Sequence, residues 1–223
     1  MKKTLSIILV TLLCVTVFAG CTTQSTENTI GTISDETPEK KEGFVYPLPE
    51  TLDINNLENC TMSVSFGEGD FFTDNDGKMM LNATVHSYEC YDAADIDSLK
   101  ENDVIVRLKE EVTVTEIQRM DSGLVQINGG DGHGGFDLVT VDNATYFEVG
   151  PNDINNYYEL GRVTLPVSED FVLADESDIN AGEKLYNADY FTSEDAEYNF
   201  YPNNTSVVVE NGTVVKMNKY YMP

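Results

Sequence analysis

Short stretches in which apolar and polar residues alternate are the feature that most constrains the fold of this chain. In residues 60–66 (CTMSVSF), Met62, Val64 and Phe66 share one side, and residues 78–85 (KMMLNATV) repeat the pattern. A period of two residues is typical of a strand that is buried on one face. Asn211-Gly212, a strong signal for a tight β-hairpin, divides another such stretch. In all, we expect strands at 60–66, 78–85, 104–108, 110–118, 124–127, 136–141, 145–149, 162–167, 171–174 and 206–217.

Helical signals are sparse, and this decides the fold class. Only residues 94–100 and 193–200 have the composition for one or two helical turns, and no period of 3.6 residues is sustained. Strands separated by short turns predict an all-β fold, an antiparallel barrel or sandwich with many hairpins. The turn formers at 150–156 (GPNDINN) offer a subdomain boundary. A single domain is preferred, because one β domain of this length is ordinary.

A glycine-rich loop lies at residues 127–138 (INGGDGHGGFDL). Gly130, Gly132 and Gly135 match the dinucleotide-binding spacing G-x-G-x-x-G. That fingerprint requires the glycines to open a helix, whereas here they lead into an expected strand. The loop therefore predicts a long β-hairpin whose glycines adopt positive φ angles. The alternative is a binding loop that uses Asp131 or His133.

Residues able to bind metals are plentiful but poorly spaced. The two histidines, His86 and His133, form no close ligand pair, and the cysteines lack a C-x₂-C arrangement, so a zinc site is not predicted. Calcium binds carboxylates in loops, but no acidic stretch has the spacing of an EF-hand. Calcium therefore stays an alternative, and no cofactor is predicted. The acidic clusters are Asp74 with Asp76; Asp92 with Asp95 and Asp97; and Asp175 with Asp178.

Tyrosines gather in the last third of the chain, where eight of the twelve lie between positions 157 and 221. Exposed tyrosines beside Asn and Asp can stack on sugars or hold a peptide, and the alternative is that they pack in the core. A candidate binding surface is the Tyr-rich segment 186–201, together with the 128–135 loop. Its candidate residues are Tyr186, Tyr190, Tyr198 and Tyr201.

The N-terminus begins with positive charge (MKK), followed by a short apolar run over residues 5–18. The next residues, Phe18-Ala19-Gly20-Cys21, resemble the lipobox of bacterial lipoproteins. This resemblance implies that residues 1–20 are a signal peptide and that Cys21 carries acyl chains such as palmitate. They would hold the protein on the extracytoplasmic side of a cell membrane. Residues 21–45, rich in Thr, Ser and Glu, predict a flexible tether before a β-rich domain over 46–223.

The two cysteines of the β-rich domain, Cys60 and Cys90, flank a turn signal at residues 73–78 (TDNDGK). In a hairpin that turns there, position 60 lies opposite 90 or 91. Export places the chain in an oxidising compartment. A structural disulfide between Cys60 and Cys90 is therefore predicted as possible, with two buried free thiols as the alternative.

Charge and missing motifs limit the function. Without residues 1–20 the chain has 11 basic and 39 acidic residues, a net charge of −28, which excludes nucleic-acid binding. The nucleophile motifs G-x-S-x-G and S-x-x-K are absent, so no catalytic residue is assigned. We therefore expect a lipid-anchored binding or interaction module with an unknown protein or glycan partner at the cell surface. The alternatives are a cell-envelope hydrolase that uses carboxylates and a calcium-stabilised structural domain.

Overall fold

The structure is a computed structural model that describes residues 41–140, 142–150 and 155–222. The predicted signal peptide, Cys21 and most of the predicted tether lie outside the described residues. The tether was expected to extend to residue 45, yet Phe44–Val45 forms strand β1, which pairs in parallel with β6 (Val104–Arg107). Val45 is buried, so the folded part includes this end of the predicted tether. None of the described residues belongs to a helix long and apolar enough to cross a membrane.

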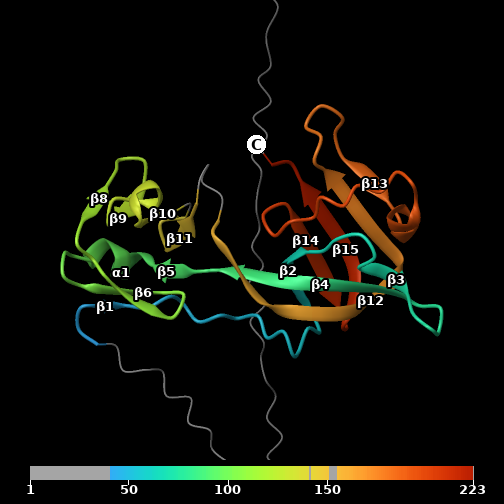
Figure 1. Ribbon diagram of the computed structural model, residues 1–223, viewed down its shortest axis with the longest axis horizontal. Helices are drawn as coiled ribbons and strands as arrows, with labels where there is room; N and C mark the ends of the chain where they lie inside the picture. The colour runs from blue at the N-terminus through green and yellow to red at the C-terminus, as the bar shows by residue number, and fades with distance from the viewer. Residues whose placement is uncertain (1–40, 141, 151–154, 223) are drawn as a thin grey trace, which may run out of the picture. The chain divides into compact units, whose positions relative to one another are not determined.

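The predicted all-β fold is confirmed, and its main part is a closed barrel of five strands (Figure 1). The barrel strands follow the order β12, β15, β14, β2 and β4, and β4 pairs again with β12. Their neighbours are antiparallel except for β12 and β15, which are parallel. The bounds are β2 (Cys60–Ser65), β4 (Met79–Tyr88), β12 (Tyr157–Glu176), β14 (Thr205–Glu210) and β15 (Thr213–Tyr220).

Strand β12 closes the barrel because it changes partners along its length. Its first part pairs with β4, and its second part pairs with β15 and with the short strand β13 (Lys184–Tyr186). The strands expected at 162–167 and 171–174 are therefore one strand of 20 residues. The predicted hairpin at Asn211-Gly212 joins β14 to β15, and both turn residues have positive φ angles, as a tight hairpin requires.

An aromatic cluster forms part of the barrel's apolar core. Phe191, in the 3₁₀ helix η3 (Ala188–Thr192), stacks on Phe71 with ring centroids 3.9 Å apart and lies 5.5 Å from Phe200. Phe71 belongs to β3 (Phe71–Thr73), which flanks β4. The helical turn expected at 193–200 is wrong, because the helical segment precedes it. There the Asn187 side chain accepts a hydrogen bond from the Asp189 amide and starts the helix that carries Phe191 into the core.

A second group of buried apolar residues, separate from the barrel core, includes Tyr91, Ile105 and Leu138. It lies among a five-stranded sheet, a three-stranded sheet and one helix. The five strands are β5 (Cys90–Asp92), β11 (Thr145–Val149), β10 (Phe136–Thr140), β9 (Val125–Ile127) and β8 (Ile117–Arg119). The three-stranded sheet joins β1 and β6 to β7 (Glu110–Thr113), and α1 spans Ala93–Ser98.

One predicted strand is divided at the junction of these two sheets. Residues 110–118 were expected to form one strand, but they contribute β7 to the three-stranded sheet and β8 to the five-stranded sheet. Val114 lies between the two strands and is fully buried. Strand pairing therefore stops between β7 and β8, where the chain passes from one sheet to the other.

Cys60 and Cys90 are free thiols, so the predicted disulfide between them is absent from the structure. The turn at 74–78 joins β3 to β4 and not β2 to β4, because residues 67–70 form an extra turn between β2 and β3. Strand β2 pairs Ser63 with His86, a register that places position 60 opposite 89. Since alternate residues face opposite sides, this one-residue offset directs Cys90 away from Cys60. Burial also raises the pKa of the Cys90 thiol to about 11, which keeps it protonated.

Candidate functional site

The glycine-rich loop is the predicted hairpin between β9 and β10, and this prediction is confirmed. Gly129, Gly130 and Gly134 have positive φ angles. Gly135 is needed for a different reason: a Cβ there would lie 1.8 Å from the Ile127 carbonyl oxygen. Asp131 and His133, the candidates for a binding loop, lie in the exposed 3₁₀ helix η1 (Asp131–His133). They line neither of the two pockets described below.

The four candidate tyrosines lie in three different settings. Tyr198 is structural, because its hydroxyl donates to the Phe191 carbonyl oxygen and its ring packs on the barrel core. Tyr201 is 52% exposed and lines a pocket of about 420 Å³ with Tyr157. Tyr186 and Tyr190 lie together, with ring centroids 4.6 Å apart, in the wall of a larger pocket.

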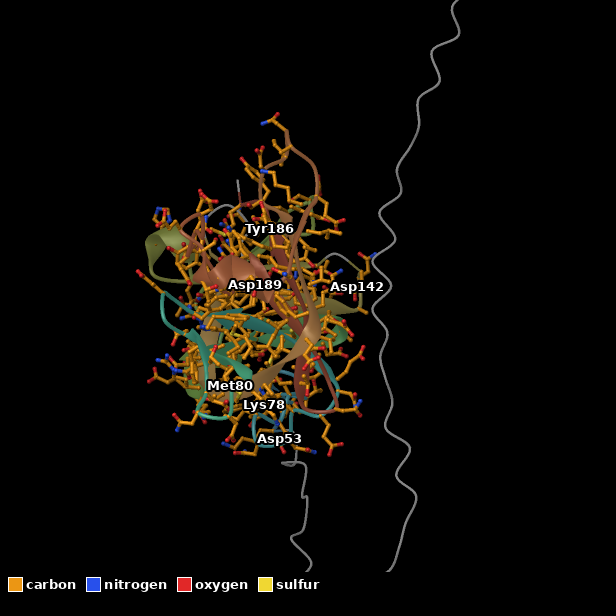
Figure 2. The ribbon with its side chains drawn as sticks, turned by 90° about the vertical axis from the view of Figure 1, so that its right-hand side faces the viewer. Asp53, Lys78, Met80, Asp142, Tyr186 and Asp189 are labelled. Carbon is orange, nitrogen blue, oxygen red and sulfur yellow. The ribbon has the colours of Figure 1, made fainter. Side chains whose placement is uncertain are left out.

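This larger pocket, of about 960 Å³, lies against β13. Its residues come from the end of β12, the loop after it, β13, η3 and the segment that follows. We call it the acidic pocket, because five carboxylates and one ammonium group line it. Figure 2 labels two of its residues, Tyr186 and Asp189, which lie above Lys78 and Asp53 in that view. The charged residues of the acidic pocket are Asp175, Asp178, Asp189, Asp195, Glu197 and Lys184.

The carboxylates of the acidic pocket differ in how far the protein satisfies them. Asp178 accepts a hydrogen bond from the Asn180 amide, and Asp189 accepts one from the Asn187 side chain. The side chains of Asp195 and Glu197 are exposed and form no hydrogen bond or ion pair with the other described residues. Two carboxylates are thus available to a ligand from solution.

The inner wall of the acidic pocket is held rigidly. Asp175 accepts hydrogen bonds from the backbone amide and hydroxyl of Ser177 and lies 3.8 Å from the buried ammonium of Lys219. Lys219 also lies over the Phe200 ring, 4.9 Å from its centroid. The Tyr190 hydroxyl accepts a hydrogen bond from the Glu197 amide, and burial raises its pKa. Both the pocket wall and its tyrosines are therefore fixed against the barrel core.

The predicted acidic clusters serve local structure. Asp74 accepts hydrogen bonds from two amides in its own turn, and Asp92 caps the start of α1. Asp97 accepts a hydrogen bond from the Tyr146 hydroxyl, and Asp175 is engaged as above. Among the described residues, no group of three or more His, Cys, Asp or Glu side chains is arranged to hold a metal ion.

A second carboxylate cluster is buried beside β5. Glu148 is 3% exposed and forms a two-pronged ion pair with Arg107, at 2.7 and 2.8 Å. Glu89 is 8% exposed and accepts hydrogen bonds from the Tyr91 hydroxyl and the Leu108 amide, both at 2.8 Å. Burial and, to a smaller extent, the charge of Glu148 raise the pKa of Glu89. None of these residues lines either pocket, so the cluster lacks access for a substrate through them.

We expect the Glu89→Gln variant to gain stability relative to the unmodified protein as pH rises from 4 to 7. The folded-state pKa of Glu89 is raised, so its contribution to stability is full below its unfolded pKa and is lost as pH rises through the folded pKa. Glutamine removes this titration and can still accept from the Leu108 amide. Denaturant unfolding at several pH values measures the difference. A difference that is independent of pH would contradict this prediction.

The matched control is Glu89→Ala, which leaves the Leu108 amide without its acceptor. Relative to Glu89→Gln, it should lower the free energy of unfolding by about 1–3 kcal/mol at every pH in this range, because neither variant titrates at position 89.

Among the described residues, a serine–histidine pair resembles an arrangement for nucleophilic catalysis. The Ser65 hydroxyl oxygen lies 2.8 Å from His86 Nε2, and Glu159 is the cross-strand partner of His86. Burial lowers the pKa of His86, and the charge of Glu159 opposes this shift. Sequence reasoning missed this set, because only the barrel register brings the three strands together. It lies on paired strands and lines neither pocket, so we assign no activity to it.

Comparisons with protein families, with curated proteins and with solved structures each find no match to this chain. The acidic pocket is therefore interpreted from its own geometry and chemistry.

Proposed function

We propose that the β-rich domain is a binding module and that the acidic pocket takes a cationic ligand. The observation that carries this proposal is the combination of five carboxylates with the paired rings of Tyr186 and Tyr190 around one hollow of about 960 Å³. Carboxylates attract a cation over a distance, and an aromatic face stabilises it in contact. The formal charge of −26 strengthens the attraction. Through the predicted acyl chains on Cys21, the module would face a partner outside the cell.

Two variants test the site with small cations. The probes are Nα-acetyl-lysine amide, whose ε-ammonium group is free, and spermidine. Their binding is measured by calorimetry at low salt. Removing the two available carboxylates in Asp195→Asn/Glu197→Gln should weaken spermidine binding about tenfold and flatten its salt dependence. Tyr186→Leu keeps an apolar side chain but loses the aromatic face, and should weaken binding about two- to fivefold.

The matched control carries the same change in net charge away from the pocket. Glu101→Gln/Asp121→Asn replaces two exposed acids outside the acidic pocket and should leave the affinity within twofold. Equal losses in both double variants would show that only the overall charge attracts the cation. Such a result would sink the proposed site.

A further inference from the structure

Strand β13 has an unpaired edge beside the acidic pocket. It lies at one end of the seven-stranded sheet and pairs only with β12, Lys184 with Asp175 and Tyr186 with Leu173. Within the described residues no other strand pairs with it. The edge of a sheet presents backbone N–H and C=O groups that can pair with another chain.

The side chains at this edge are more apolar than is usual for a strand edge that faces only water. Leu185 is 64% exposed, and Ile179 in the preceding loop is 68% exposed. Since neighbouring residues of a strand face opposite sides, Lys184 and Tyr186 share one face and Leu185 lies on the other. An added strand would therefore find a polar, aromatic face and an apolar face.

The edge and the acidic pocket share residues. Lys184, Leu185 and Tyr186 all contribute to the wall of the pocket. A strand that paired with β13 would lie next to its carboxylates. Another copy of this chain is a poor occupant, because each copy has a formal charge of −26. A basic segment has the complementary charge.

We propose that the cationic ligand is an extended polypeptide segment that adds to β13 as a further strand. This inference rests on the proposed function. Backbone hydrogen bonds supply part of the affinity, and alternate side chains supply specificity. Basic residues at alternate positions face the carboxylates and tyrosines of the acidic pocket, and an apolar residue between them packs on Leu185. A strand of three residues spans roughly 10 Å, so the recognised core is basic–apolar–basic.

The test uses an acetylated, amidated peptide in which Lys-Val-Lys is flanked by threonines. It should bind at least tenfold more tightly than acetyl-lysine amide, because it adds a second charge and backbone hydrogen bonds. Methylating one peptide amide at a time gives a matched series. Along a strand, amide groups point alternately toward and away from the neighbour. Methylation of an amide that faces β13 should weaken binding about three- to tenfold, and methylation of the next amide should not.

Hydrogen exchange gives a second readout in the protein itself. Amides among Lys184–Tyr186 that point away from β12 should exchange more slowly when the peptide is bound. Those of Phe71–Thr73, at the other end of the same sheet, should be unchanged. Acetyl-lysine amide should protect neither strand.

The outcomes separate this inference from the proposed function. If the peptide binds but every methylated form binds equally well, strand addition is wrong and the cation pocket stands. If a Lys-Lys-Val peptide binds as well as Lys-Val-Lys, the alternating pattern is wrong. If neither peptide nor small cation binds, both proposals are overturned.

Discussion

Replacing Phe191 by alanine is expected to lower the free energy of unfolding by about 3–5 kcal/mol, the cost of removing a large aromatic side chain from a packed core. Phe191 is 3% exposed and lies at the centre of the barrel's aromatic cluster. Its ring contacts Phe66, Phe71, Phe171, Tyr190, Tyr198 and Phe200. Urea unfolding followed by tyrosine fluorescence measures the loss.

A matched control for this substitution is Phe72→Ala. Phe72 is the neighbour of Phe71 in β3 but is 38% exposed, so its loss should cost about 1 kcal/mol or less. Equal effects of the two substitutions would show that Phe191 is not part of a packed core. Because η3 also carries Asp189 and Tyr190, Phe191→Ala should weaken cation binding at the acidic pocket as well.

The second large effect is expected from Arg107→Met. Glu148 is 3% exposed and depends on Arg107 for both of its charged contacts. Without the guanidinium, the buried carboxylate loses its opposite charge and keeps only the Asn156 amide as a hydrogen-bond donor among the described side chains. This loss costs about 3 kcal/mol or more. Thermal or urea unfolding of the variant at pH 7 measures the loss.

The chain contains its own control for this pair. Arg162 forms an ion pair with Asp70, but its side chain is 54% exposed, so Arg162→Met should cost less than about 1 kcal/mol. The double variant Arg107→Met/Glu148→Leu removes both charges and should recover stability relative to Arg107→Met alone. A double variant that is less stable than the single one would contradict the burial argument.

The candidate site was only partly predictable. The Tyr-rich segment 186–201 drew attention to Tyr186 and Tyr190, but Tyr198 of the same segment is structural. Composition could not separate them, because only the fold places Tyr186 and Tyr190 in the wall of the acidic pocket and directs the Tyr198 hydroxyl to the Phe191 carbonyl oxygen. The partnership of Asp175 with Lys219 had no sequence signal, since β12 and β15 pair across more than 40 residues of chain.

By itself, the sequence determined most of the strands and the tight turn at Asn211-Gly212 of this protein. Alternation of apolar and polar residues specifies a strand and its buried face, and Asn211-Gly212 specifies the turn between β14 and β15. The conformation of the loop at 127–138 is likewise set locally, because only a glycine at position 135 fits against the Ile127 carbonyl oxygen. These features depend on neighbours in the chain.

Only the tertiary structure decided which strands pair and which side chains lie close together at the ends of the strands. The turn at 67–70 sets the β2 register that separates Cys60 from Cys90, and the change of partners along β12 closes the barrel. Alternation is the same for every possible partner, so pairing is chosen by how much apolar surface the whole chain can bury. The acidic pocket and the free edge of β13 are consequences of that choice.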